Sequence, residues 1–199
     1  MGSCSRAGMT GSREISKGIS VGCTPAEVHV RVVGRGTFQN GQPLRRYALE
    51  MIERGYNGFV VDLDKCQGMD STFLGVLAGI GLKLNQTRRE GRIYVINAGP
   101  RSMELLETLG LDRLFGIEGS QQAVTKHKPP PDNEFQKLPE AEGVPVEKVV
   151  NKDDTANLML EAHENLIRAD RRNEPKFKDL TRFLRERAER QKDDTEKES

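Results

Sequence analysis

The chain has 199 residues, of which 35% are hydrophobic, 31% are charged and only 5% are aromatic, and its formal net charge is +1. This composition argues against a single apolar core running through the whole chain. Because the net charge is close to zero and no basic stripe is present, the sequence also argues against nucleic acid as a partner.

Charged residues are unevenly distributed along the chain. They occupy 27 of the first 124 positions and 34 of the remaining 75, and six of the nine prolines lie in this second part. A compact domain followed by a charged, proline-punctuated extension has this distribution. We therefore predict four regions: a flexible leader over residues 1–24, an α/β domain over 25–125, a Pro-rich linker over 126–150 and a charged helical extension over 151–199.

The sequence predicts neither membrane insertion nor export. The longest apolar stretch, residues 73–84, is interrupted by glycines and is too short to span a bilayer, and the first residues lack the apolar core of a signal peptide. The three cysteines, Cys4, Cys23 and Cys66, are odd in number and scattered, which is typical of reduced thiols. We therefore expect a cytoplasmic protein.

Strands and helices alternate along the predicted domain. Residues 26–33 alternate apolar and polar side chains, as expected of a strand with one wetter face. Apolar residues then recur at helical spacing over residues 44–52, and residues 59–63 form a β-branched run typical of a buried strand.

The second half of the domain continues this order. A helix begins at residues 70–71 and ends near Gly91, and we interpret its glycines between positions 75 and 81 as serving turns and close helix packing. The elements that follow are a buried strand over 92–97, a helix over 102–109, an edge strand over 114–117 and a helix through 121–124. The alternation predicts an α/β fold with a mixed, largely parallel sheet flanked by helices.

Two amphipathic helices are predicted in the extension, one beginning at residues 153–155 and the other at residues 173–175. Their apolar positions recur at helical spacing: Leu158, Met159, Ala162, Leu166 and Ile167 in the first, and Phe177, Leu180, Phe183 and Leu184 in the second. Such stripes can dock on a partner, form a homo-oligomer or fold back on the domain. The sequence leaves all three open.

The segment with the most chemical information is VDLDKCQGMDSTFLGVLAG, residues 61–79. A buried strand ends in acidic residues, a short loop follows, and Asp70-Ser71-Thr72 opens a helix. The first N–H groups of a helix lack internal partners and carry partial positive charge, so they can accommodate a phosphate on a hydroxyl there. Such a phosphate would change any partner surface laid over the helix start. The alternative is that Asp70 and Ser71 only cap the helix.

Three segments together resemble the STAS domain of bacterial anti-sigma-factor antagonists: EVHVRVVGRG, VVDLDKCQGMDSTFLGVLAG and RIYVINAGPRSMELLETLGLDRLFGI. The resemblance extends from about residue 26 to residue 124, half of the chain. In that family the serine after the aspartate is phosphorylated by a partner serine kinase, itself an anti-sigma factor, and a metal-dependent serine phosphatase reverses this. The unphosphorylated form binds the kinase and frees the sigma factor.

The resemblance implies that Ser71 is the phosphoacceptor, with Thr72 as the second choice. The family's usual Asp-Ser-Ser-Gly is Asp-Ser-Thr-Phe in this chain. The implied acceptor loop and partner surface comprise Asp70, Met69, Phe73, Leu74 and Gly75. The implied protein is a STAS-like phospho-switch regulator without catalytic residues, metal or cofactor, whose partners are a serine/threonine kinase anti-sigma factor and a serine phosphatase.

Two other functions remain open on the sequence. The first is a non-phosphorylated STAS scaffold subunit of a transporter or signalling complex, which would use the extension helices instead of Ser71. The second is a metal-dependent hydrolase in which Asp62, Asp64 and Asp70 coordinate Mg²⁺. Acidic residues that merely solvate the end of a buried strand explain the same aspartates more simply, so we predict no enzymatic activity.

Overall fold

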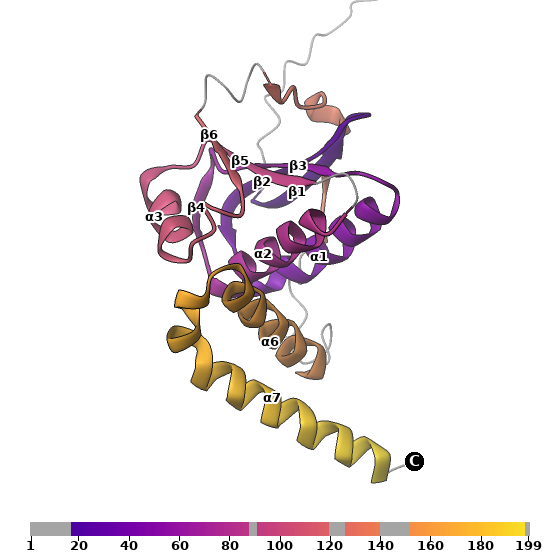
Figure 1. Cartoon of the computed structure of the whole chain (residues 1–199). Helices are drawn as coiled ribbons and strands as arrows, with labels where there is room; N and C mark the ends of the chain where they lie inside the picture. Colours follow the sequence, from indigo (N-terminus) through magenta and orange to yellow (C-terminus); the bar gives the residue numbers. More distant parts are fainter. Residues whose placement is uncertain (1–16, 88–90, 120–125, 140–151, 198–199) are drawn as a thin grey trace, which may run out of the picture.

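A computed structural model describes residues 17–87, 91–119, 126–139 and 152–197 (Figure 1). The helix predicted through residues 121–124 lies outside these ranges. The described residues form a sheet with helices α1 and α2 against one face, and helices α6 and α7 follow as further layers on the same side (Figure 1).

The sheet has seven strands in the order β6-β5-β3-β2-β1-β7, with β4 paired to β2. Strand β2 (Glu27–Gly36) runs parallel to β3 (Gly58–Asp62) and antiparallel to β1 (Gly18–Cys23). Strands β3, β5 (Arg92–Ile96) and β6 (Gly116–Glu118) continue the parallel part. The predicted mixed, largely parallel sheet is confirmed, and β6 is the predicted edge strand.

Three strands lie where the sequence predicted none. Strand β1 falls inside the predicted leader, and its Ile19 and Val21 belong to the hydrophobic core. Strand β4 (Cys66–Met69) replaces the predicted loop before the acceptor, and β7 (Gln136–Lys137), in the predicted linker, pairs with β1. These strands are short or poor in β-branched residues, so hydrogen bonds to distant strands, not local propensity, define them.

Helices α1 (Phe38–Glu53), α2 (Ser71–Asn85) and α3 (Pro100–Thr108) complete the domain. Helices α1 and α2 pack against each other beneath the sheet, and α3 lies beside β4 (Figure 1). Buried side chains of the strands and helices form one core cluster, which includes Val28, Val30, Leu44, Phe73 and Leu77. In the described ranges no helix combines the length and the apolarity that crossing a bilayer requires.

The other face of the sheet carries polar side chains that residues 126–139 cover. His127 lies against the ring of Tyr94, with ring centroids 4.6 Å apart. The guanidinium of Arg31 lies 3.8 Å from the centre of the Phe135 ring. The first part of the predicted linker is therefore attached to the sheet, because its aromatic and polar side chains find partners there.

Helix α6 (Lys152–Ala169) folds back onto α2, and α7 (Glu174–Lys197) packs against α6 (Figure 1). Both helices were predicted, and of the three arrangements that the sequence left open, α6 adopts the fold-back. The buried Asn173 secures the turn between them, since its Nδ2 donates to the carbonyl oxygens of Leu109 and Leu166, each at 2.9 Å. The side chain of Phe183 on α7 remains 59% exposed.

Candidate functional site

Asp70 positions the start of α2. Its backbone N–H donates to the carbonyl oxygen of Gly36 at the end of β2 (2.9 Å). Its Oδ1 accepts from the N–H of Phe73 in α2 (2.8 Å), and its Oδ2 accepts from the N–H of Phe38 in α1 (2.9 Å). One carboxylate thus caps α2, accepts the first N–H of α1, and fixes the starts of both helices at the same edge of the sheet. Asp70 is the N-cap residue of α2, which is the capping arrangement that the sequence left open as the alternative.

Ser71 is the first residue of α2, and its side chain contacts α6. Its Oγ lies 3.0 Å from Nε2 of His163. Nδ1 of His163 lies 2.7 Å from the carbonyl oxygen of Met159, which can only accept. The proton of the neutral ring is therefore assigned to Nδ1, and the hydroxyl of Ser71 donates to Nε2.

His163 is buried, with 3% of the residue exposed, and the ring of Phe177 lies 4.9 Å from its own between centroids. Burial lowers the pKa of His163 below its usual value of 6.5, while the bond to the Met159 carbonyl and the charge of Asp70 act in the opposite direction. The ring is therefore neutral at physiological pH and keeps Nε2 free to accept.

Two glycines on α2 allow α6 to approach closely. A Cβ atom at Gly75 would lie 2.3 Å from the backbone oxygen of Ala162, and one at Gly79 would lie 2.4 Å from Nδ2 of Asn165. Neither position has room for a side chain. The interpretation of these glycines as places of close helix packing is confirmed, and the packed helix is α6.

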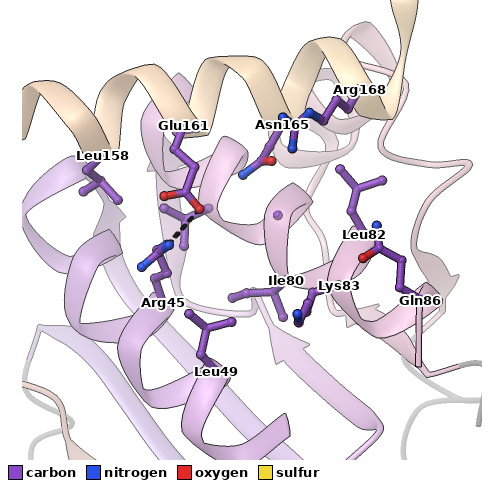
Figure 2. Close-up of a pocket in the computed structure, with 13 residues that line it drawn as sticks. Arg45, Leu49, Ile80, Leu82, Lys83, Gln86, Leu158, Glu161, Asn165 and Arg168 are labelled. Atoms are coloured by element: carbon purple, nitrogen blue, oxygen red, sulfur yellow. Dashed lines mark hydrogen bonds and ion pairs between the residues drawn. The ribbon is translucent and has the colours of Figure 1, made fainter. Parts of the chain in front are cut away.

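A groove of about 450 Å³ lies beside this contact, between α1, α2 and α6 (Figure 2). Arg45 of α1 donates two hydrogen bonds to Oε1 of Glu161, from Nε at 3.1 Å and from Nη2 at 2.8 Å. Lys83 and Arg168 also line the groove, whereas Ser71 does not. The groove therefore separates α6 from α1 over part of its length and gives no substrate access to the serine.

The structure buries most residues of the predicted partner surface. Four of the predicted site residues are at most 8% exposed: Met69, Thr72, Phe73 and Leu74. Gly75 lies beneath Ala162. These residues are buried because α2 packs against the sheet on one side and against α1 and α6 on others. Only Asp70 and Ser71 remain partly exposed.

The three aspartates of the hydrolase alternative do not form a common site. Oδ1 of Asp62 accepts from the N–H of Asp64 at 3.1 Å and from Nδ2 of Asn97 at 2.9 Å. Both carboxylate oxygens of Asp70 accept from helix N–H groups. Over the described ranges, no three His, Cys, Asp or Glu side chains come together as metal ligands. In the described residues the three aspartates thus serve local hydrogen bonding.

His163 is the site residue that the sequence prediction missed. It lies 92 positions from Ser71, and no motif joins the two. The sequence feature that could have identified His163 was its place next to Ala162, on the same buried side of α6 as Leu158 and Leu166. A histidine in an apolar stripe indicates burial, but its partner depends on where the helix docks.

Comparison with known proteins identifies the domain. A family model described as "Mlab, STAS domain" matches residues 19–117. Similar solved structures include the anti-sigma factor antagonist SpoIIAA in its unphosphorylated form (16% identity, TM-score 0.47) and the Bacillus cell fate determinant SpoIIAA in the phosphorylated form (18%, 0.46). Another is an anti-sigma factor antagonist from Mycobacterium paratuberculosis (20%, 0.45). The matches cover 54% of this chain and 94%, 97% and 90% of those chains, respectively. No curated protein matches the chain.

The chain thus contains a STAS domain. Residues 19–117 are its STAS domain, as the resemblance of the sequence implied. The matched range includes Ser71 and begins within β1, which places that strand in the domain and not in a leader. It ends before α6, so His163 comes from outside the matched range.

Proposed function

We propose that this chain is an anti-sigma-factor antagonist-like regulator of the cytoplasm, in which phosphorylation of Ser71 controls binding to a serine kinase anti-sigma factor. A serine phosphatase would restore the unmodified form. The chain itself catalyses no reaction in this scheme, because the ATP is bound by the kinase. The observation that carries the proposal is the position of Ser71, which Asp70 fixes at the first residue of α2 in a STAS domain.

The chemistry of this position suits a switch. A phosphate on Ser71 would adjoin the N-terminal N–H groups of α2, where the helix dipole favours negative charge. The same phosphate adds ~1.5 to 2 negative charges beside the carboxylate of Asp70. A partner surface laid over this helix start would therefore meet a different charge in the two forms.

Phosphopeptide analysis of the full chain, purified from its native host, tests the acceptor. We expect phosphate on Ser71 and none on Thr72, since Thr72 is buried. The Ser71→Ala variant should carry no phosphate, whereas Thr72→Val, which keeps the shape of the buried side chain, should still be modified. Phosphate on a different residue of the chain would contradict the assignment.

Capture of the host's serine kinase on the immobilised full chain tests the partner. Ser71→Ala should retain the kinase, and Ser71→Asp should weaken its binding by about tenfold, because the carboxylate mimics part of the phosphate charge. Kinase binding that is indifferent to both substitutions would show that Ser71 is not the switch.

The contact between Ser71 and α6 favours a second candidate, a STAS scaffold subunit of a transporter or signalling complex that is not phosphorylated. In the conformation described here, the hydroxyl of Ser71 is hydrogen-bonded to His163 of α6. In a scaffold, partners from the host would bind Ser71→Ala and Ser71→Asp equally well. Substitution of the exposed Phe183 by Ser would instead reduce binding, because α7 would supply the contact.

A further inference from the structure

We propose that α6 is an intramolecular lid on the acceptor: docked α6 and phosphorylated Ser71 exclude each other, and a partner must displace α6 to reach Ser71. The nature of the modification and of the partner rests on the proposed function. The displacement of α6 does not, and it can be measured on the chain alone.

The hydrogen bond between Ser71 and His163 leaves no space for a phosphoryl group. Oγ and Nε2 are 3.0 Å apart, so a phosphorus atom and three oxygens cannot be inserted between them. The proton of the ring is on Nδ1, where it is bonded to Met159, and Nε2 presents a lone pair to the serine. A phosphate dianion would face that lone pair. A phosphate on Ser71 therefore breaks this hydrogen bond and removes a contact that holds α6 on α2.

The contact between α6 and α2 is mixed, because Leu158 and Leu166 of α6 belong to the core cluster and buried polar side chains lie beside them. It includes the buried side chains of His163 and Asn165, and the ion pair between Arg45 and Glu161 at its rim is partly exposed to solvent. The sheet side of α2 is instead packed with apolar side chains such as Leu77. Surfaces that separate within a chain are more polar than permanent interfaces. The buried polar side chains make the boundary between α2 and α6 the place where we expect the molecule to open.

The turn that follows α6 keeps this helix close to its binding surface on α2. Asn173 is bonded to the carbonyl oxygen of Leu109, and Nζ of Lys176 donates to the carbonyl oxygen of Thr108 at 2.7 Å. These bonds attach the end of α6 to the end of α3. An undocked α6 would therefore remain at a high effective concentration near Ser71, which makes it an effective competitor for an external partner.

Two substitutions on α6 open the lid without changing α2. In Ala162→Arg a long side chain replaces a methyl group that is 1% exposed and lies against Gly75. Asn157→Arg is the matched control, because it places the same residue at an exposed position of the same helix. His163→Ala removes the bond to Ser71 without adding bulk, and it serves if Ala162→Arg disturbs the folding of the extension.

Hydrogen–deuterium exchange of the full chain measures the opening. In Ala162→Arg and His163→Ala we expect exchange in α6 and in the first turn of α2 to rise by about tenfold, with β3 and β5 unchanged. Asn157→Arg should behave like the unmodified chain. Exchange in α6 that does not change, or that rises equally in β3 and β5, would overturn the proposal, because α6 would then be a permanent part of the core.

The same measurement tests the exclusion without a kinase. Ser71→Glu places a carboxylate opposite the lone pair of His163 Nε2, whereas Ser71→Gln places an amide that can donate to it. At about pH 8, where the histidine is neutral, the Glu variant should expose α6 more than the Gln variant. Equal exchange in the two variants would show that charge at this position does not displace the helix.

Phosphate incorporation by the host kinase then separates the lid from the proposed function. We expect Ser71 to be phosphorylated about tenfold faster in Ala162→Arg than in Asn157→Arg, in proportion to the open population. Equal rates would overturn the lid while leaving the phospho-switch intact. An opened helix with no phosphate on Ser71 in any variant would overturn the phospho-switch, and the lid would then cover an unmodified binding face.

Discussion

Asp70 illustrates how one side chain determines the geometry of an acceptor. Its two carboxylate oxygens bind one N–H of α1 and one of α2, and Ser71 is placed because it follows directly in the chain. The serine itself makes its side-chain bond to a different element, α6. Asp70 thus determines where the acceptor serine lies, and His163 determines what its hydroxyl contacts.

Replacement of this carboxylate tests the double cap. We predict that Asp70→Ala lowers the free energy of unfolding by about 2 kcal/mol, because two helix N–H groups lose their acceptor. Asp70→Asn keeps one acceptor oxygen and should lose about half as much. Denaturant unfolding measures both changes, with Asp64→Ala at an exposed position as the control. Equal stability of Asp70→Ala and the unmodified chain would contradict the cap.

The two partners of the central hydrogen bond differ in how predictable they were. Ser71 follows a cap residue at the start of a strongly apolar helix, so local sequence alone predicts its place. His163 acquires its role only when α6 docks, and that contact joins residues 92 positions apart. Periodicity predicts which face of a helix is buried, but not the surface that buries it.

At the scale of elements, the glycines of α2 are as informative as its apolar residues. Glycine destabilises a helix relative to alanine, so three glycines in one fifteen-residue helix indicate that something packs where their side chains would be. Gly75 and Gly79 contact α6, and Gly81 contacts Phe115 and Leu114. The close approach of α6 depends on the first two.

A pair of Gly→Ala substitutions tests this dependence. Alanine stabilises a helix by about 1 kcal/mol relative to glycine, and at Gly41 in α1 its Cβ would meet Val76 at an ordinary 3.4 Å. We therefore predict that Gly41→Ala is neutral or stabilising. Gly75→Ala should instead be destabilising and speed exchange in α6, because its Cβ would lie 2.3 Å from a backbone oxygen. A stabilising effect of Gly75→Ala would show that α6 does not rest on this helix.

The predicted elements agree best with the structure where local pattern and burial coincide. The runs 59–63 and 92–97 are β-branched and became β3 and β5, buried within the sheet. The sequences of β1 and β4, GISVGC and CQGM, have a weak local preference for β-structure. They form strands because their backbones hydrogen-bond to β2. Pairing of this kind depends on the fold and cannot be derived from the segment itself.

For the molecule as a whole, the polar face of the sheet makes stability depend on pH. His29 of β2 lies on this face and is buried. Burial, and then the neighbouring His127 and Arg31, lower its pKa from 6.5 to about 4, while Asp62 opposes them. The unfolded chain therefore binds a proton on this histidine at a higher pH than the folded chain does.

The direction in which pH changes the stability follows from this difference in proton binding. Between about pH 6.5 and pH 4 the unfolded state holds more protons, so the folded state loses stability as the pH falls. We predict a loss of about 2 kcal/mol from this residue between about pH 7.5 and pH 5. Denaturant unfolding at both values measures the loss, and His29→Gln should remove most of it. His163→Ala is the comparison, since His163 acts in the same direction through α6. An unchanged slope in His29→Gln would refute the assignment.

The strand pairing between β1 and the segment after the STAS range has a consequence for self-association. Residues Gln136 and Lys137 pair with β1, and the N–H of Leu138 donates to the carbonyl oxygen of Ile19 at 2.8 Å. Among the described residues, the sheet consequently ends in β7, two residues long, and in β6, three residues long. Short terminal strands offer little ladder for a foreign strand to extend. Loss of residues 126–139 would leave the six residues of β1 as the outermost strand and offer a longer ladder to a foreign strand.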